Sequence, residues 1–376
     1  MNKIVITGGH HSAALPVIYK LKAKYPRLEI VWFGHKYSLL GDKNPTLEYK
    51  EIVALGIPFY NISAGKLYKT YNLLRLLKIP YGFFQAFYLL ARIKPDIVLS
   101  FGGYLAAPAV LAAYLLGIPT LTHEQTVVSG YANRFISKLV KRVLVSWKES
   151  KKYFPSEKTV VTGLPLRPNV FESASSSFLF ENQLPTIYIT AGKTGSHKIN
   201  ELIKESMPDL LKITNLIHQT GDYSEFNDYS ELVDTYNLLR QDPNTANLGT
   251  YVPRKFVFEN EIGEVYKLAS VVIGRAGAHT CYELYALSKP CVLIPISWVS
   301  HNEQFENAKV LEGAKLAIIL DESKLSPEIL LKAIKDRLAQ HAVGDIGESV
   351  KSSALAAAAL IVDEIEKVYK ENTFTP

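Results

Sequence analysis

Short, uninterrupted apolar runs alternate with longer helical patterns along the whole chain, and this alternation constrains the fold more than any other feature. Strands that are buried on both faces are apolar throughout, so runs of this kind predict parallel strands. The predicted strands are residues 4–7, 29–33, 97–101, 119–122, 142–146 and 159–162, then 186–190, 216–219, 271–273, 291–294 and 317–319. Helical patterns between them predict βαβ crossovers, and therefore an α/β fold with a doubly wound sheet in each half.

The length of 376 residues suits two domains that each bury a core of their own. A linker is indicated at residues 163–168 (GLPLRP), followed by the serine-rich residues 173–177. We therefore predict a Rossmann-like N-terminal domain over residues 1–163 and a Rossmann-like C-terminal domain over residues 164–348. An alanine-rich helix over residues 349–370 is expected to pack back across the cleft between them.

The net charge of +6 is divided unevenly along the chain. Residues 1–165 hold 22 Lys and Arg against 8 Asp and Glu, a net charge of +14, whereas the rest of the chain carries −8. A basic half beside an acidic half indicates different partners for the two domains, with anionic lipid, a phosphorylated substrate or nucleic acid as candidates for the first. The only two cysteines, Cys281 and Cys291, exclude a disulfide scaffold, and no Cys/His cluster has zinc-site spacing.

Residues 97–122 carry no charge and are long enough to resemble a membrane span. Glycine and proline divide the stretch into a strand, an apolar helix over residues 108–116 and a second strand, which is the pattern of a soluble fold. The N-terminus enters a strand pattern at once and has no signal-peptide pattern. We therefore expect a soluble or peripheral protein.

Four predicted strands lead through glycine-bearing turns into helices, at residues 7–10, 101–104, 191–196 and 274–278. Such turns let the backbone approach a phosphate at the positive end of a helix dipole, although each is also compatible with a tight turn that binds nothing. None matches the P-loop or the GxGxxG fingerprint. The chain also lacks Asp-x-Asp, so we predict no metal site, and a diphosphate would be met by backbone amides with Arg167 or Arg275. Arg275 has an alternative interpretation as a structural cation.

Several longer motifs carry a resemblance to a known family. They are TGGH at 7–10, GGY at 102–104, IPTLTHEQ at 118–125, GLPLR at 163–167, GRAGAHTCYE at 274–283 and EQFENA at 303–308. With these motifs in this order, the chain resembles the MurG-type peptidoglycan N-acetylglucosaminyltransferases of glycosyltransferase family 28. The resemblance covers nearly the whole length of the chain. The resemblance implies a GT-B fold, in which two Rossmann-like domains face a central cleft.

The resemblance implies that the C-terminal domain binds UDP-N-acetylglucosamine as a substrate and that no cofactor is required. Glu283 would hold the ribose hydroxyls, and the start of the helix after Gly277 would face the diphosphate. The implied donor-binding residues are Arg167, Gly192, Lys193, Gly195, Asn200, Arg275, Gly277, Ala278, His279, Thr280, Glu283, Glu303, Gln304 and Asn307. As an alternative interpretation, Glu303, Gln304 and Asn307 would form only a polar helix face. Glu283 would likewise be a solvated residue on a helix surface.

The N-terminal domain would bind an undecaprenyl-pyrophosphoryl-MurNAc-peptide, whose sugar 4-hydroxyl attacks the donor. His10 or Glu124 would take the proton, because histidine accepts one near neutral pH. The implied acceptor-binding residues are Gly8, Gly9, His10, Tyr104, His123, Thr126 and Asn133. A plain loop residue remains an alternative for His10, and buried structural residues for His123 and Glu124.

Three positions depart from the family pattern. Lys193 replaces a small hydroxyl residue, Thr126 replaces an asparagine, and Glu303 replaces a glutamine near the sugar. Lys193 and Glu303 leave the identity of the transferred sugar open, and Thr126 weakens the implied acceptor contact at that position. Two other activities therefore remain as alternatives: a related GT-B enzyme that moves another sugar onto a lipid, and a UDP-sugar 2-epimerase. A non-catalytic membrane scaffold is the third.

A basic and aromatic stretch runs from Lys66 to Lys94. Aromatic side chains enter the lipid boundary while Lys and Arg meet anionic headgroups, so we expect it to bind an anionic membrane. A core helix with a solvated face is the alternative. Nothing else in the chain supports nucleic-acid binding. With a lipid acceptor, these features predict a peripheral protein at the cytoplasmic face of the bacterial membrane, with cell-wall synthesis proteins as further partners.

Overall fold

The computed structural model describes residues 1–37, 45–64, 73–172, 177–192, 194–223, 225–245, 247–296, 302–340 and 347–373. For residues 73–78, 244, 347 and 348 it describes the backbone alone. The chain divides into two compact units, Met1–Leu166 with Ser353–Pro376, and Arg167–Ser352. The division falls inside residues 163–168, and the end of the chain groups with the first unit.

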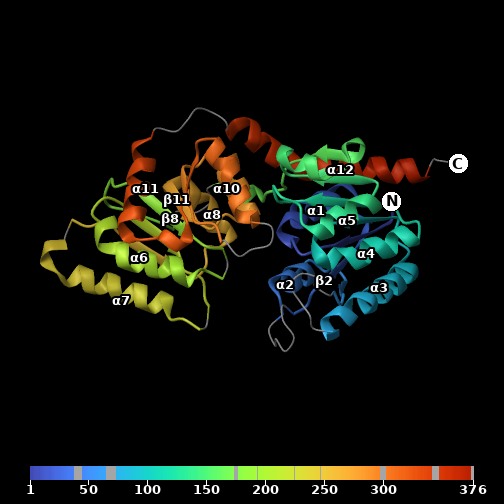
Figure 1. The fold of residues 1–376 in the computed structure, drawn as a ribbon, viewed down its shortest axis with the longest axis horizontal. Helices are drawn as coiled ribbons and strands as arrows, with labels where there is room; N and C mark the ends of the chain where they lie inside the picture. The colour runs from blue at the N-terminus through green and yellow to red at the C-terminus, as the bar shows by residue number, and fades with distance from the viewer. Residues whose placement is uncertain are drawn as a thin grey trace. The chain divides into compact units, whose positions relative to one another are not determined.

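The first unit contains a parallel seven-stranded sheet (Figure 1). Its strands, in spatial order, are β3 (Phe59–Asn61), β2 (Glu29–Gly34), β1 (Lys3–Thr7), β4 (Ile97–Ser100), β5 (Thr120–Glu124), β6 (Arg142–Val145) and β7 (Thr159–Val161). Because the order reverses direction between β1 and β4, the loops that follow these two strands flank a switch point, where open α/β sheets bind their ligands.

The helices of this unit cover its sheet, and the last one comes from the far end of the chain. They are α1 (His11–Lys24), α2 (Leu47–Ala54), α3 (Leu73–Ile93), α4 (Gly103–Leu115), α5 (Tyr131–Leu139) and the short η1 (Lys148–Tyr153) and η2 (Ser156–Lys158). Helix α12 (Gly347–Thr373) lies beside α1, to which an ion pair between Lys24 and Glu366 joins it (Figure 1). One core cluster joins α3 and α4 to β1, β2 and β4.

The second unit repeats the plan with a parallel six-stranded sheet. Its strands are β10 (Tyr251–Arg254), β9 (Asn215–Gln219), β8 (Thr186–Thr190), β11 (Ala269–Gly274), β12 (Cys291–Leu293) and β13 (Ala317–Ile319). Its helices are α6 (His197–Leu210), α7 (Asp228–Gln241), α8 (Glu259–Leu268), α9 (Ala278–Ala286), α10 (Glu303–Gly313) and α11 (Pro327–Ala339), with η3 (Pro168–Val170), η4 (Pro243–Thr245) and η6 (Glu322–Lys324). The switch point lies between β8 and β11.

Alternation along β8 decides which helices it contacts. Ile187 and Ile189 belong to the core cluster that includes α6 and α11. Tyr188 points to the opposite face, where its ring meets Tyr266 of α8 edge to face at 5.7 Å between centroids. Successive residues of a strand face opposite sides of the sheet, so β8 is buried on both. This explains why the strand reads as one apolar run.

All eleven predicted strands are present, and the described part of the chain contains two further strands, β3 and β10, that were not predicted. Helix α4 begins at Gly103, five residues before the predicted start at residue 108, so Pro108 lies inside it. Among the described residues, no helix has both the length and the apolar character needed to cross a membrane.

Candidate active site

The turn after β1 packs tightly against the loop after β4. Gly8 has φ +131°, and a Cβ there would lie 2.8 Å from the Phe101 backbone, so this position requires glycine. The N–H of Phe101 donates to the Thr7 carbonyl oxygen at 2.6 Å. These contacts place His10, directly before α1, beside the switch point of the first sheet.

His10 is partly covered, and its Nδ1 is buried without a hydrogen-bond partner among the described residues. Burial lowers the pKa of His10 below its usual value, and the nearby negative charge of Glu124 partly opposes this effect. A neutral imidazole carries one nitrogen lone pair that can take a proton. His10 is therefore a titratable side chain beside the first switch point whose neutral form is favoured by burial.

Glu124, at the end of β5, is almost fully buried and holds two loops. Its Oε1 accepts hydrogen bonds from the N–H and the hydroxyl of Thr126, at 3.1 and 2.9 Å. Its Oε2 accepts a hydrogen bond from the side-chain amide nitrogen of Asn133 at 2.7 Å. The side-chain oxygen of Asn133, Oδ1, in turn accepts from the backbone N–H of Gly103 at 2.8 Å. Both carboxylate oxygens of Glu124 accept hydrogen bonds from protein groups. Glu124 therefore fixes the loops after β4 and β5 and places a negative charge between them.

His123 is fully buried under the same loops. Its Nε2 lies 3.1 Å from the Gly163 carbonyl oxygen, and its Nδ1 lies 3.3 Å from the Gln125 amide nitrogen. These partners assign the proton to Nε2. Burial lowers the pKa of His123 to about 4, so the ring is neutral at physiological pH. Tyr104, in the first turn of α4, is more exposed, and its ring lies 6.0 Å from that of His35.

In the second unit, the loop after β8 packs against the loop after β9. Gly195 has φ +73°, and a Cβ there would lie 1.9 Å from the Thr220 carbonyl oxygen. The amide of Gln219 donates to the Gly192 carbonyl oxygen at 2.8 Å. Lys193, the residue that departs from the family pattern in this loop, lies outside the described residues.

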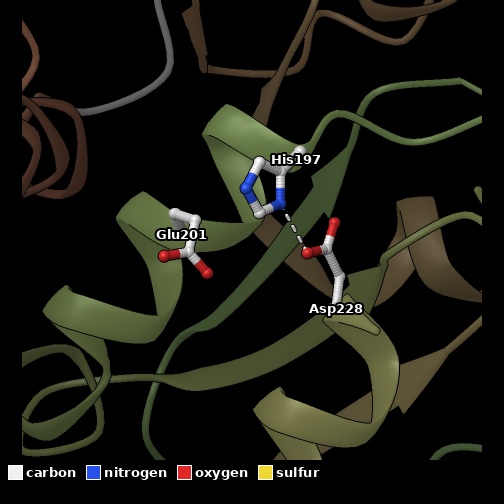
Figure 2. Close-up of side chains that lie close together, drawn as sticks. All are labelled: His197, Glu201 and Asp228. Carbon is white, nitrogen blue, oxygen red and sulfur yellow. Dashed lines mark hydrogen bonds and ion pairs between the residues drawn. The ribbon is translucent and has the colours of Figure 1, made fainter. Parts of the chain in front are cut away.

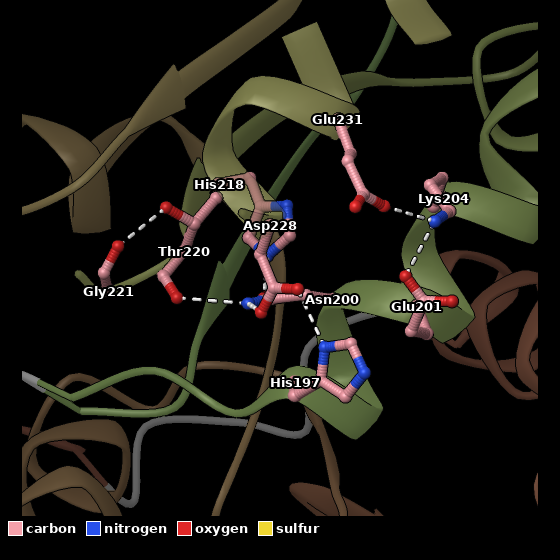
Figure 3. A network of polar contacts seen from close by, with 9 residues as sticks. All are labelled: His197, Asn200, Glu201, Lys204, His218, Thr220, Gly221, Asp228 and Glu231. Carbon is pink, nitrogen blue, oxygen red and sulfur yellow. Dashed lines mark hydrogen bonds and ion pairs between the residues drawn. The ribbon is translucent and has the colours of Figure 1, made fainter. Parts of the chain in front are cut away.

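Asn200 lies beneath this loop, in a buried polar network (Figure 3). Its amide nitrogen donates to the Thr220 carbonyl oxygen at 3.0 Å and to Asp228 Oδ2 at 2.6 Å, and its oxygen lies 3.0 Å from His218 Nε2. Burial lowers the pKa of His218 to about 3, so His218 is neutral and donates through Nε2. The structure thus commits the side chain of Asn200 to fixing the loop.

His197, Glu201 and Asp228 bring ligand-type atoms within 4.8 Å of one another (Figure 2). His197 Nδ1 contacts Asp228 Oδ1 at 2.7 Å, and its ring stacks on Phe226 at 3.7 Å between centroids. Glu201 forms an ion pair with Lys204 at 2.6 Å. Each member is therefore engaged by protein partners, and the group is a network that joins α6 to α7.

Arg275, in the loop after β11, ties three segments together. Its guanidinium donates to Ser196 Oγ at 2.8 Å, to the Ile294 carbonyl oxygen at 3.1 Å and to Glu322 Oε1 at 2.5 Å. Its side chain is 11% exposed. These contacts join Arg275 to the loops around the second switch point, and none of them is to a helix C-terminus.

Helix α9 begins directly after this loop, with Gly277 as its N-cap. The N–H of Cys281 makes the first bond of the helix, to the Gly277 carbonyl oxygen, so the amides of Ala278, His279 and Thr280 precede the helical ladder. The positive end of the helix dipole lies at the same place. This end of α9 therefore favours an anion such as a diphosphate.

Glu283 follows in the next turn of α9, where its Oε2 accepts a hydrogen bond from the hydroxyl of Tyr266 at 2.7 Å. Burial raises the pKa of Glu283 to about 7, against the effects of Tyr266 and Arg167. Arg167 itself forms an ion pair with Glu259 at the start of α8. Tyr266 was not predicted from the sequence, because a tyrosine in an amphipathic helix gives no signal of its tertiary partner.

Helix α10 supplies amides that hold the neighbouring loops. Gln304 Oε1 accepts from the N–H of Ile296 at 3.1 Å. The amide of Asn307, which is fully buried, donates to the Ala276 carbonyl oxygen at 3.2 Å. Glu303 is half-buried at the first position of the helix.

Two family models match the chain. The glycosyltransferase family 28 N-terminal domain matches residues 6–145, and the family 28 C-terminal domain matches residues 186–364. A protein of Geobacter metallireducens named UDP-N-acetylglucosamine–N-acetylmuramyl-(pentapeptide) pyrophosphoryl-undecaprenol N-acetylglucosamine transferase is 31% identical, over 96% of this chain and 95% of its own.

Solved structures superimpose on this chain over nearly its whole length. Acinetobacter baumannii MurG superimposes with a TM-score of 0.73 at 26% identity, over 98% of this chain and 100% of its own. The UDP-GlcNAc 2-epimerase of Neisseria meningitidis has a TM-score of 0.64 over 98% of this chain and 100% of its own, but it is only 15% identical. The likeness to the epimerase is therefore one of fold alone.

Proposed function

The chain belongs to glycosyltransferase family 28, and we propose that it transfers N-acetylglucosamine from UDP-N-acetylglucosamine to undecaprenyl-pyrophosphoryl-MurNAc-peptide, a step of peptidoglycan synthesis. The observation that carries the proposal is the match to a named transferase over 96% of this chain and 95% of that relative. The acceptor's 4-hydroxyl oxygen would form the new bond to the anomeric carbon as the bond to UDP breaks, with inversion. UDP leaves with the bonding electrons, and the hydroxyl proton passes to a base.

In this proposal, the second unit binds the donor. The amides of Gly277, Ala278, His279 and Thr280 face the diphosphate and stabilise the charge that develops on UDP as it leaves. Glu283 accepts hydrogen bonds from the ribose hydroxyls through its remaining acceptor positions. Glycines of the β8 loop admit the nucleotide, and Asn200, Arg275, Gln304 and Asn307 act by holding the surrounding loops.

The first unit binds the acceptor and supplies the base. The position of His10 supports this assignment, because it lies directly before α1 beside the switch point, close enough to Glu124 for that charge to raise its pKa. Glu124 contributes its fixed charge, which stabilises the imidazolium formed when His10 takes the proton. Asn133, Thr126 and His123 support the loops around Tyr104 and the glycines of the β1 turn.

The experiment combines purified lipid acceptor with a panel of UDP-sugars and measures both sugar transfer and UDP release. We expect transfer of N-acetylglucosamine in preference to other sugars. His10→Ala should lower turnover at least 100-fold with nearly unchanged UDP affinity, since general-base catalysis contributes about 10²–10⁴-fold. Glu283→Ala should weaken UDP binding instead. Epimerisation of UDP-N-acetylglucosamine without a lipid acceptor would contradict the proposal, as would near-normal turnover of the His10 variant.

We also propose that the first unit docks on the cytoplasmic face of the membrane through α3. Tyr81, Phe84 and Tyr88 are spaced by three and four residues, so they share one helix face, and each is more than 60% exposed. Arg92 and Lys94 follow them at the end of the helix. Residues 66–72 and the side chains of residues 73–78, which complete the predicted basic stretch, lie outside the described part.

A further inference from the structure

Helix α8 contacts two residues that the sequence assigns to the donor site. Its Tyr266 donates to Glu283 on α9, and its first residue, Glu259, pairs with Arg167. Its Gly263 packs so closely on η3 and the residues after it that a Cβ would lie 2.4 Å from the Asn169 carbonyl oxygen and 1.7 Å from that of Glu172. A helix held this tightly is a rigid support for the groups it touches.

Tyr266 is itself fixed on two sides. Its ring is 2% exposed and meets Tyr188 of β8 edge to face, with an interplanar angle of 86°. Its hydroxyl lies 2.7 Å from Glu283 Oε2. Burial raises the pKa of Tyr266 well above its usual value, so the hydroxyl stays protonated and donates at every physiological pH. The tyrosine therefore holds one carboxylate oxygen of Glu283 in a fixed place.

We propose that Tyr266 is a positioning residue of the donor site, which orients the Glu283 carboxylate so that its free acceptor positions meet the two ribose hydroxyls of the nucleotide. This inference rests on the proposed donor-binding function of Glu283. Without Tyr266, the carboxylate would have to lose rotamer freedom when the nucleotide binds, and affinity would fall. Tyr266 touches no substrate in this arrangement and acts through Glu283 alone.

The experiment measures the affinity of the full chain for UDP and for 2′,3′-dideoxy-UDP at pH 8 by titration calorimetry. We expect Tyr266→Phe, which keeps the ring in place, to weaken UDP binding five- to tenfold and to leave dideoxy-UDP binding unchanged. The double variant Tyr266→Phe/Glu283→Gln should bind UDP no more weakly than Glu283→Gln alone. The matched control is Tyr251→Phe, which removes another buried hydroxyl of the same unit, 3.0 Å from His218 Nδ1, and should not change the ratio of the two affinities.

The pH dependence gives a second readout. The hydrogen bond from Tyr266 favours the ionised form of Glu283, so the pH at which UDP affinity is half lost should rise in Tyr266→Phe. Equal weakening of UDP and dideoxy-UDP, or no change in either, would overturn the positioning role while leaving the function of Glu283 intact. Unchanged UDP affinity in Glu283→Gln would instead remove the ribose role of Glu283, and the inference with it.

Discussion

Replacing Glu48 with Gln is expected to stabilise the first unit above pH 7 and to change its stability little near pH 4.5. Glu48 lies in the first turn of α2 and is 8% exposed. Its Oε1 accepts a hydrogen bond from the indole N–H of Trp32 at 2.6 Å. Burial raises the pKa of Glu48 from 4.5 to about 7, because the two hydrogen bonds from Trp32 and His35 only partly replace water around the charged form.

The direction in which stability changes with pH follows from the number of protons that the folded and unfolded states bind. Between pH 4.5 and 7 the folded state holds a proton on Glu48 that the unfolded state has released, so stability falls as the pH rises through this range. The difference between the two pKa values corresponds to about 3 kcal/mol at pH 8, at about 1.4 kcal/mol per unit. Gln keeps an acceptor for the Trp32 indole N–H and carries no charge. The variant therefore does not lose the stability that the parent loses when the buried Glu48 carboxylate ionises.

The assay is urea denaturation at pH 4.5, 6 and 8, followed by tryptophan fluorescence in a Trp298→Phe background. The remaining tryptophans, Trp32 and Trp147, both belong to the first unit. We expect the stability difference between Glu48→Gln and the parent to grow from near zero to about 3 kcal/mol. Glu29→Gln, whose side chain is 53% exposed, serves as the control and should show no such growth. A difference that stays constant with pH, or a variant less stable than the parent at pH 8, would refute the reasoning.

Two further predictions concern ligand surfaces. Gly195→Ala should weaken UDP binding at least tenfold by calorimetry, because its Cβ would lie 1.9 Å from the Thr220 carbonyl oxygen and the β8 loop must move; unchanged affinity would show that this loop does not contribute to the donor site. Serine at Tyr81, Phe84 and Tyr88 together should reduce co-sedimentation with phosphatidylglycerol vesicles at least tenfold, since a buried aromatic side chain contributes about 1.5–3 kcal/mol. Leu238→Ser, at an exposed position of the second unit, is the control, and equal loss in both variants would count against α3 as the membrane surface.

Most of the strands that sequence reasoning identified are central ones, although it also found the edge strands β7 and β13, and the two it missed, β3 and β10, form the other two sheet edges. β3 has the sequence FYN with two exposed residues, and β10 contains Pro253. An edge strand has one unpaired side, so it tolerates proline and polar residues that would disrupt a central strand. Neither segment forms the continuous apolar run that identified the others.

The candidate site combines features that neighbouring residues determine with contacts that form only when distant segments pack together. Glycine turns are local features, so their positions followed from the sequence, whereas the start of α4 lies five residues before the predicted one. The partners of the charged residues did not, because Arg275 meets Glu322 and Glu283 meets Tyr266 only after separate βαβ units have packed together. No single spacing or motif encodes these pairs, and without them the pKa of Glu283 could not be inferred.

The amides in the family motifs illustrate why a motif residue need not touch a ligand. Asn133, Asn200 and Asn307 are all buried, and their side chains bond to the carbonyl, amide or carboxylate groups of loops at strand ends. A site built from loops leaves backbone groups without a helix or sheet partner, and these groups need hydrogen bonds from side chains that stay fixed. Substituting such an asparagine would lower affinity by releasing a loop. Membership of a motif is therefore weak evidence for a ligand contact when the side chain is buried and bonded to a neighbouring loop.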